Sequence, residues 1–193
     1  MKNNNKISFL VFNLFLLFFF TNYSYANFKN NLINKLESTK TLSFSFVQTI
    51  GKNKESGNCI IKYPLLLKCH YPKKKKEIIA DGKKLAIVKK RYKKIYYYPL
   101  NKTPLFYILQ KKNIIYLINN YKPIKVDSNK VVYEYTEKNL SKLKIFFNKN
   151  SFNLEGWSTI DSYSNEVNFE IKNVETNTVV ENNIFIIPKE EDL

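Results

Sequence analysis

Hydrophobic residues repeat along this chain first with a helical period and then mostly with a period of two. In residues 28–36, apolar side chains recur every three or four positions, which predicts a short amphipathic helix. In residues 42–50, Leu42, Phe44 and Phe46 alternate with small or polar residues, so they share one face of a strand. The start of the chain therefore predicts a helix followed by a strand with one buried face.

Short strand-like segments, separated by polar turns, account for most of the remaining chain. A turn is expected at residues 51–57, and Asp81-Gly82 is a strong turn signal. Thr103-Pro104 opens an apolar run as an expected N-cap and first helical residue, and a second apolar patch covers residues 114–118. The expected strands are residues 59–63, 65–71, 77–80, 85–88, 95–98, 131–135, 143–147, 154–160, 167–171 and 184–187. So many short strands favour a sandwich, a barrel or a partly open barrel.

The first 26 residues have the organisation of a secretory signal peptide. Lys2 and Lys6 precede an apolar run at residues 7–20, and Ser24 and Ala26 suit a signal-peptidase site. The run is shorter than the roughly 20 residues that span a bilayer, although an uncleaved anchor is the alternative. We expect residues 1–26 to be removed and residues 27–193 to form one secreted domain. No cysteine lies in or just after this segment, so a lipid anchor is not expected.

Cys59 and Cys69 lie in the two expected strands that flank Pro64. In a tight antiparallel hairpin centred near Pro64, residues whose numbers sum to 128 face each other, and these two cysteines do so. An oxidising compartment favours a disulfide, with two free thiols as the alternative.

Composition makes the chain strongly basic, with a formal net charge of +16. Removing Lys2 and Lys6 with the signal peptide leaves 30 basic and 16 acidic residues, a net charge of +14. Arg91 is the only arginine, and arginine is favoured for recognising phosphates and bases, so nucleic acid is not an expected partner. The basic runs at residues 73–76 and 89–94 are either docking sites for acidic or lipid surfaces, with transient membrane contact, or solvated turns.

No constellation of residues predicts catalysis or a cofactor. His70 is the only histidine, and on a strand it faces away from the neighbouring Cys69. No zinc-type cysteine pair, serine elbow or glycine-rich phosphate loop occurs in the sequence. We therefore expect no catalytic residue, no metal and no cofactor, and a protein that is not an enzyme.

Several segments, taken in order, resemble the family of outer-membrane lipoprotein carriers called LolA. SFSFVQT at residues 43–49 resembles the family's F-x-Q strand, and residues 57–64 resemble its G-x-x-x-x-K-x-P strand. IIADGKKLAIV at residues 78–88 is similar to its strand-turn-strand segment, and TPLFYIL at residues 103–109 to its T-P helix. NNIFIIPKEEDL at residues 182–193 resembles the family's ending. The resemblance covers nearly the whole expected mature chain.

This resemblance implies a mainly β fold: an open, incomplete antiparallel β-barrel with short α-helices covering its concave face as a lid. It also implies a monomeric carrier whose cavity takes the acyl chains of triacylated lipoproteins. Cargo would come from an inner-membrane ABC transporter and go to an outer-membrane receptor. The alternatives are a carrier of another lipid and a secreted basic module that binds polyanions. Tyr63 stands where the family commonly has an arginine that helps to hold the lid closed.

The residues expected to line the cavity come from the apolar faces of the expected strands, and those of the lid from the expected helices. Such faces are also what a plain core presents, and reading the alternation one residue out would reverse a face. The expected wall residues are Phe44, Phe46, Ile61, Leu65, Leu67, Leu85 and Ile87. The expected lid residues are Leu32, Leu36, Leu105, Ile108 and Leu109.

Overall fold

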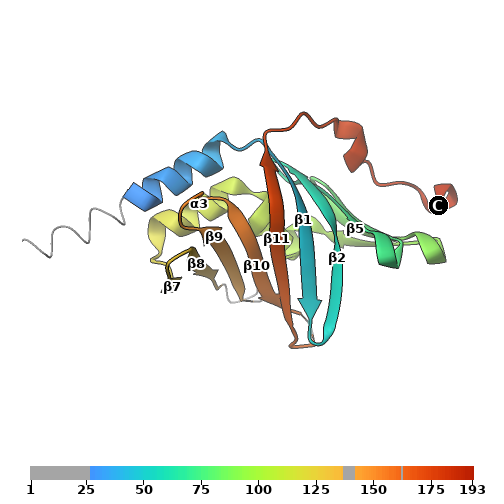
Figure 1. The fold of residues 1–193 in the computed structure, drawn as a ribbon. Helices are drawn as coiled ribbons and strands as arrows, with labels where there is room; N and C mark the ends of the chain where they lie inside the picture. The colour runs from blue at the N-terminus through green and yellow to red at the C-terminus, as the bar shows by residue number, and fades with distance from the viewer. Residues whose placement is uncertain (1–26, 137–141, 162) are drawn as a thin grey trace, which may run out of the picture.

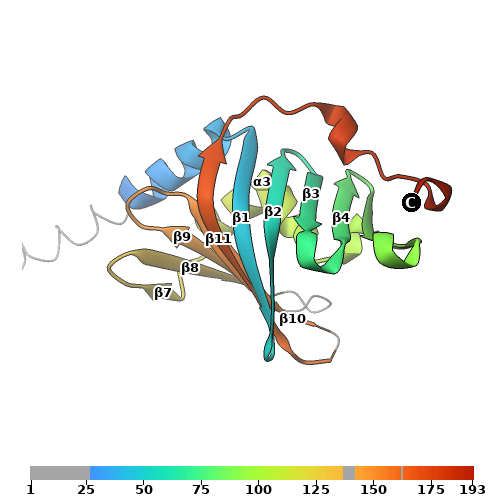
Figure 2. The ribbon, with the colours of Figure 1, turned by 45° about the vertical axis from the view of Figure 1, so that its right-hand side comes forward.

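A curved antiparallel sheet of eleven strands forms the body of the protein in a computed structural model (Figures 1 and 2). The structure describes residues 27–136, 142–161 and 163–193, so the expected signal peptide lies outside the described residues. The strands are β1 (Thr41–Ile50), β2 (Asn53–Lys62), β3 (Leu66–Tyr71), β4 (Lys76–Asp81), β5 (Lys84–Lys89), β6 (Lys94–Pro99), β7 (Lys125–Val126), β8 (Lys130–Tyr135), β9 (Leu143–Asn148), β10 (Leu154–Ile160) and β11 (Glu166–Thr176).

The sheet grows in both directions from β1. The strand order is β6-β5-β4-β3-β2-β1-β11-β10-β9-β8-β7, so only the β1–β11 pair joins segments distant in sequence. Within the described residues, β6 and β7 end the sheet without pairing to each other, and the barrel stays open. The expected mainly β, open antiparallel architecture is confirmed.

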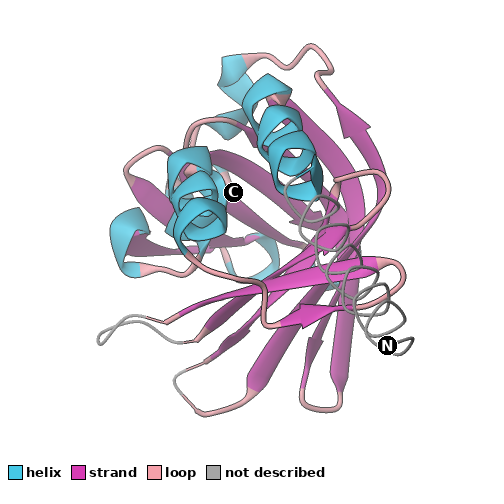
Figure 3. Cartoon of the chain, turned by 90° about the vertical axis from the view of Figure 1, so that its left-hand side faces the viewer, coloured by secondary structure: helices cyan, strands magenta, loops and turns pink. Residues whose placement is uncertain are grey.

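Three helical segments lie across the concave side of the sheet: residues 27–38, α2 (Leu105–Leu109) and α3 (Lys111–Asn120) (Figure 3). Their apolar side chains join those of the sheet in one buried cluster that includes Leu32 and Ile114. Among the helices that the structure describes, none has the length and apolar character needed to cross a membrane.

The alternation in the sequence locates the buried faces correctly. Leu42, Phe44 and Phe46 are buried, while the intervening Ser43 and Ser45 are partly exposed. In the β2–β3 pair, Cys59 lies opposite Cys69 as the hairpin geometry predicts.

Polar turn signals were less reliable than the alternation. Residues 51–57 were expected to be a turn, but β2 begins at Asn53, because backbone pairing with β1 continues beyond the apolar part of the hairpin. Thr103 was expected to cap a helix. Its hydroxyl instead donates to the Leu100 carbonyl (2.8 Å) in the preceding 3-10 turn η3 (Leu100–Lys102), and α2 begins at Leu105.

The C-terminal segment covers the outer face of the sheet near β4 to β6. Residues 184–187 were expected to be a strand, but Asn182–Phe185 forms a 3-10 turn, η4. That expectation was wrong because the apolar side chains of this segment pack against the face of the sheet and not along an edge. Ile187 and Leu193 pack on a second buried cluster, formed by Ile79, Ala86, Val88 and Ile95.

A group of charged side chains on the outer face surrounds Glu77 of β4. Its carboxylate accepts a hydrogen bond from Lys90 Nζ (2.9 Å) and lies near Lys68 Nζ (4.0 Å) and His70 Nδ1 (3.5 Å). Burial raises the pKa of Glu77. The hydrogen bond from Lys90 and the surrounding positive charges together lower it by more than burial raises it, so the net shift is downward.

Glu77→Gln should make the free energy of unfolding less dependent on pH in the acid range. A carboxyl group whose pKa is lowered by folding stabilises the protein above its unfolded pKa of about 4.3, and this contribution is lost as the pH falls through the folded pKa. Urea unfolding at pH 7, 4.5 and 3 measures the effect. The exposed Glu175→Gln is the control, and equal acid sensitivity of both variants would contradict the prediction.

Candidate functional site

A pocket of about 440 Å³ opens on the concave face, between the sheet and the start of α2. Its walls come from strands on both sides of β1 and from the segment Thr103 to Leu105. The aliphatic lining residues are Leu67, Ile78, Leu85, Ile87, Leu105 and Val167. This volume lies within the roughly 300–1,000 Å³ range of small-molecule pockets.

A row of aromatic rings runs along one side of the pocket, and three of them, Trp157, Phe169 and Tyr71, line it. Trp157 of β10 stacks on Phe169 of β11 (4.2 Å between ring centroids), and Phe169 stacks on Phe46 of β1 (4.5 Å). Phe46 then meets Tyr71 of β3 edge-on at 4.8 Å. The rings come from four strands, β10, β11, β1 and β3, so this side is apolar across the centre of the sheet.

Gly57 lets this row pass over β2. It is the register partner of Phe46, and a Cβ atom there would collide with the His70 carbonyl oxygen and approach the Phe46 ring to 2.9 Å. The missing side chain leaves the space through which Phe46 reaches Tyr71. Gly57 therefore shapes the wall without itself lining the pocket.

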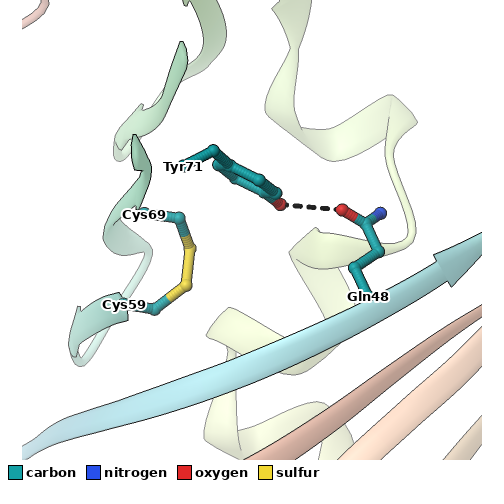
Figure 4. Close-up of a disulfide and its surroundings, with 4 residues drawn as sticks. All are labelled: Gln48, Cys59, Cys69 and Tyr71. Carbon is teal, nitrogen blue, oxygen red and sulfur yellow. Dashed lines mark hydrogen bonds between the residues drawn. A yellow bond between two sulfur atoms is a disulfide. The ribbon is translucent and has the colours of Figure 1, made fainter. Parts of the chain in front are cut away.

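Polar groups in the pocket are few and mostly satisfied by neighbours. The Tyr71 hydroxyl donates to Gln48 Oε1 at 2.9 Å (Figure 4). Burial, with a smaller effect of Glu55, raises the pKa of Tyr71, so its hydroxyl stays neutral. The carboxylate of Asp161 accepts hydrogen bonds from the backbone N–H groups of Tyr163 (2.8 Å) and Asn165 (2.9 Å) in its own turn. The pocket thus presents apolar surface with little to orient a polar ligand.

The disulfide between Cys59 and Cys69 lies beside the pocket, and Cys69 belongs to its lining (Figure 4). The expected pairing is therefore present. It joins β2 and β3 at directly opposed positions of the wall.

The structure brings part of the expected site together. Leu67, Leu85, Ile87 and Leu105 line the pocket. The other expected wall residues lie deeper or to the side: Phe44, Phe46 and Ile61 are buried in the main core, and Leu65 packs against it from the β2–β3 turn. The remaining expected lid residues are also buried in that core: Leu32, Leu36, Ile108 and Leu109. Contact of any of these residues with a ligand stays a prediction.

Several lining residues were not identified from the sequence. Tyr71 and Ile78 follow from the alternation along β3 and β4, which places Tyr71 on the face of Leu67 and Cys69. Trp157 and Phe169 reach the site only because β11 pairs with β1, and no local pattern reveals that pairing.

Lys111, the first residue of α3, ties the helices to the sheet. Its Nζ donates to the carbonyls of Glu37 (3.0 Å) and Thr39 (2.9 Å) at the end of the N-terminal helix. The same ammonium lies 5.4 Å from the centroid of the Tyr63 ring in the β2–β3 turn. Burial lowers the pKa of Lys111, while the charge of Glu37 opposes that shift.

Backbone contact adds to this attachment. In the β2–β3 turn, the Leu65 N–H donates to the Leu109 carbonyl at the end of α2 (3.0 Å). The Tyr63 hydroxyl is buried and has no hydrogen-bond partner among the described residues, so Tyr63 offers the helices a ring but no polar bond. The positive charge at the contact between the helices and the β2–β3 turn is therefore supplied by Lys111 of α3 and not by residue 63.

Comparison with known proteins identifies one family. The model of the family described as outer membrane lipoprotein carrier protein LolA matches residues 37–188. A search of the curated proteins found no significant match.

Solved structures with a similar arrangement share little sequence with this chain. An uncharacterized conserved protein from Thermus thermophilus aligns with 6% identity and a TM-score of 0.48, over 85% of this chain and 94% of that one. A LolA superfamily protein from Nitrosomonas europaea aligns with 9% identity and a TM-score of 0.42, over 82% and 97%. A chain of the MucA/MucB complex from Pseudomonas aeruginosa aligns with 9% identity and a TM-score of 0.47, over 86% and 62%.

Gly57→Ala should destabilise the protein by about 1–3 kcal/mol, the usual cost of overpacking, because the new methyl group displaces Phe46 or the β3 backbone. Urea unfolding measures the change. The neighbouring, exposed Ser56→Ala is the control and should stay within about 0.5 kcal/mol of the parent. A stable Gly57→Ala variant would show that the aromatic row does not depend on this gap.

Lys111→Met should loosen the N-terminal helix without unfolding the sheet. The variant keeps an unbranched apolar stem but loses two hydrogen bonds to carbonyls at a helix end, which are worth about 1 kcal/mol or more. Hydrogen exchange at residues 29–38 should accelerate severalfold, while exchange in β1 stays slow. Lys112→Met, at an exposed position, is the matched control, and equal exchange in both variants would refute this role of Lys111.

Proposed function

This chain belongs to the LolA family, and we propose that it is a periplasmic carrier that binds the acyl chains of lipoproteins. In this proposal it receives triacylated lipoproteins from an inner-membrane ABC transporter and passes them to an outer-membrane receptor. It acts as a monomer and catalyses no reaction. Residues 1–26 direct secretion and residues 27–193 are the carrier domain.

The observation that supports this function best is the apolar pocket between the sheet and the start of α2, next to helices that are held by few polar contacts. Each CH₂ group exposed to water costs about 0.8 kcal/mol, so an acyl chain needs a continuous apolar shelter. The pocket offers aliphatic and aromatic walls, and Tyr71, Gln48 and Asp161 are already hydrogen-bonded, while the buried Thr159 hydroxyl has no partner among the described residues. Weakly directional walls of this kind suit cargo that is bound and released without a chemical step.

Release and loading require the helices to move. A volume of about 440 Å³ is that of a single modest ligand, whereas a triacylated lipid has three long chains. The helices cross the concave face without adding to the strand ladder. Their outward movement would uncover the apolar side chains of the main core, including the expected wall residues Phe44, Phe46 and Ile61.

The disulfide supports the proposed compartment. Disulfides persist in oxidising compartments such as the periplasm and are rare in the bacterial cytosol. A bond in the wall of the pocket would keep β2 and β3 aligned while the helices move.

The direct test is release of a lipoprotein from inner-membrane vesicles that contain the transporter and ATP. The purified mature chain should appear in the supernatant with lipoprotein bound, as measured by immunoblotting and native mass spectrometry. Failure to release any lipoprotein under conditions in which a known family member does so would end the proposal.

Ile87→Asn should reduce lipoprotein release and acyl-chain affinity by about tenfold. An amide without a hydrogen-bond partner in the apolar wall costs about 1–3 kcal/mol when an acyl chain displaces its water. Tyr97→Asn lies on the adjacent strand but on the outer face, and it should leave both quantities unchanged. If the two variants behave alike, the pocket is not where the chains bind.

A further inference from the structure

A second cavity, of about 710 Å³, lies at the end of the concave face where the β3–β4 and β5–β6 turns meet. Cations supply most of its lining, and we refer to it as the cationic cleft. Its lining residues are Lys73, Lys74, Lys75, Lys76, Lys89 and Arg91, together with Glu55 and Tyr92.

Two turns of the same conformation build the cleft. Pro72–Lys74 (η1) and Lys90–Tyr92 (η2) are 3-10 turns, each followed by a lysine in the left-handed region, Lys75 (φ 46°) and Lys93 (φ 49°). The Lys90 N–H donates to the Lys75 carbonyl (3.1 Å) and joins the turns. The cleft is therefore a defined surface between two connected turns.

Positive charge in the cleft is largely uncompensated. Glu55 is its only acidic residue, and its carboxylate bonds to Lys76 at 2.6 Å. Within the part of the chain that the structure describes, Lys73, Lys74 and Arg91 form no ion pair. Lys76 also lies directly opposite Lys89 in the β4–β5 register, an unfavourable pairing of like charges. A bound anion would relieve that repulsion.

The cationic cleft continues directly into the apolar pocket. On β4, Ile78 lines the pocket and Lys76 lines the cleft; on β5, Ile87 and Lys89 do the same. Residues two apart on one strand share a face and lie about 7 Å from each other. The pocket residue Tyr71 marks the boundary, with Lys76 Nζ 3.9 Å from its ring centroid. The concave face thus changes from apolar to cationic within the length of one small amphiphile.

We infer that the site takes an amphiphile whose acyl chain lies in the apolar pocket and whose phosphate-bearing head group lies in the cationic cleft. This inference rests on the proposed function, since it assumes that the pocket holds an acyl chain. Continuity with the pocket favours a lipid head over an acidic polypeptide. The side-chain chemistry is compatible with a phosphate, because lysine ammonium groups bind phosphate as point charges.

Binding of short-chain lipids to the full mature chain tests the inference. The probes are dioctanoyl phosphatidylglycerol and dioctanoyl phosphatidylcholine below their micellar concentrations, and glycerol 3-phosphate as the head group alone. Calorimetry in low salt should give at least about tenfold tighter binding of the anionic lipid than of the zwitterionic one, a ratio that corresponds to about 1.4 kcal/mol. Added salt should reduce that ratio, because the cleft is open to solvent.

Removing cleft charges should abolish the preference without abolishing lipid binding. The variant is Lys73→Gln/Lys74→Gln/Lys89→Gln, which leaves the bonded Lys76 in place. The control, Lys122→Gln/Lys149→Gln/Lys172→Gln, removes equal charge from exposed positions outside the cleft and should keep the preference. Both variants should bind phosphatidylcholine like the parent protein.

The outcomes separate the inference from the function on which it rests. Equal binding of both lipids by the parent chain, or binding of neither, overturns the inference, whereas the carrier function is contradicted only by failure of the lipoprotein-release test. If glycerol 3-phosphate binds as tightly as phosphatidylglycerol, the pocket and the cleft do not form one site for an amphiphile, and the cleft is a site for a free anion. A further outcome is that a polyglutamate peptide binds the parent chain but not the cleft variant, while the parent chain shows no preference between the two lipids. That result would overturn the inference in favour of an acidic protein partner.

Discussion

The concave face of an open sheet must be covered by something other than the sheet, and this constraint organises the whole protein. A closed barrel would bury its interior by hydrogen bonding its last strand to its first. Here β6 and β7 do not meet among the described residues, so side-chain packing from three helical segments covers the inner face. Packing is strong but has little directional preference, and the specific polar ties are few, Lys111 and Leu65 among them. A cover of this kind can be stable and still separate from the sheet.

Local patterns in the sequence predicted a mainly β chain, and the family resemblance implied its open barrel, but neither located the whole pocket. Alternation at Leu42, Phe44 and Phe46 gave the inner face of β1, and the hairpin register gave the disulfide, because both depend on neighbours along the chain. The pocket also reaches β10 and β11, which the expected wall did not include, because Phe169 of β11 lies beside Phe46 of β1. That contact depends on a pairing between the two ends of the domain, which no short segment encodes.

The outer face of the sheet was also only partly predictable from local sequence patterns. The consecutive apolar residues in β4 and β5 were interpreted as two strands, with Leu85 and Ile87 assigned to the cavity wall and no role given to the opposite face, although runs without alternation indicate burial on both faces. The second cluster, around Ile79 and Val88, confirms burial on the outer side, where Ile187 covers it. The 184–187 segment was therefore recognised as apolar but assigned to the wrong structure, because its partner was a surface and not a strand edge.

The contact between Glu190 and β6 bears on the amide groups at one margin of the sheet. The Ile95 N–H, which belongs to a strand at the margin of the sheet, donates to the Glu190 carboxylate (2.8 Å). A margin with free amide groups is a template onto which another molecule can add a strand, and sheet proteins commonly protect such margins with charge. At the opposite margin, β7 has only two residues, too short to serve as a template. A charged group at one margin and a very short strand at the other therefore each disfavour the addition of a strand from another molecule at that place.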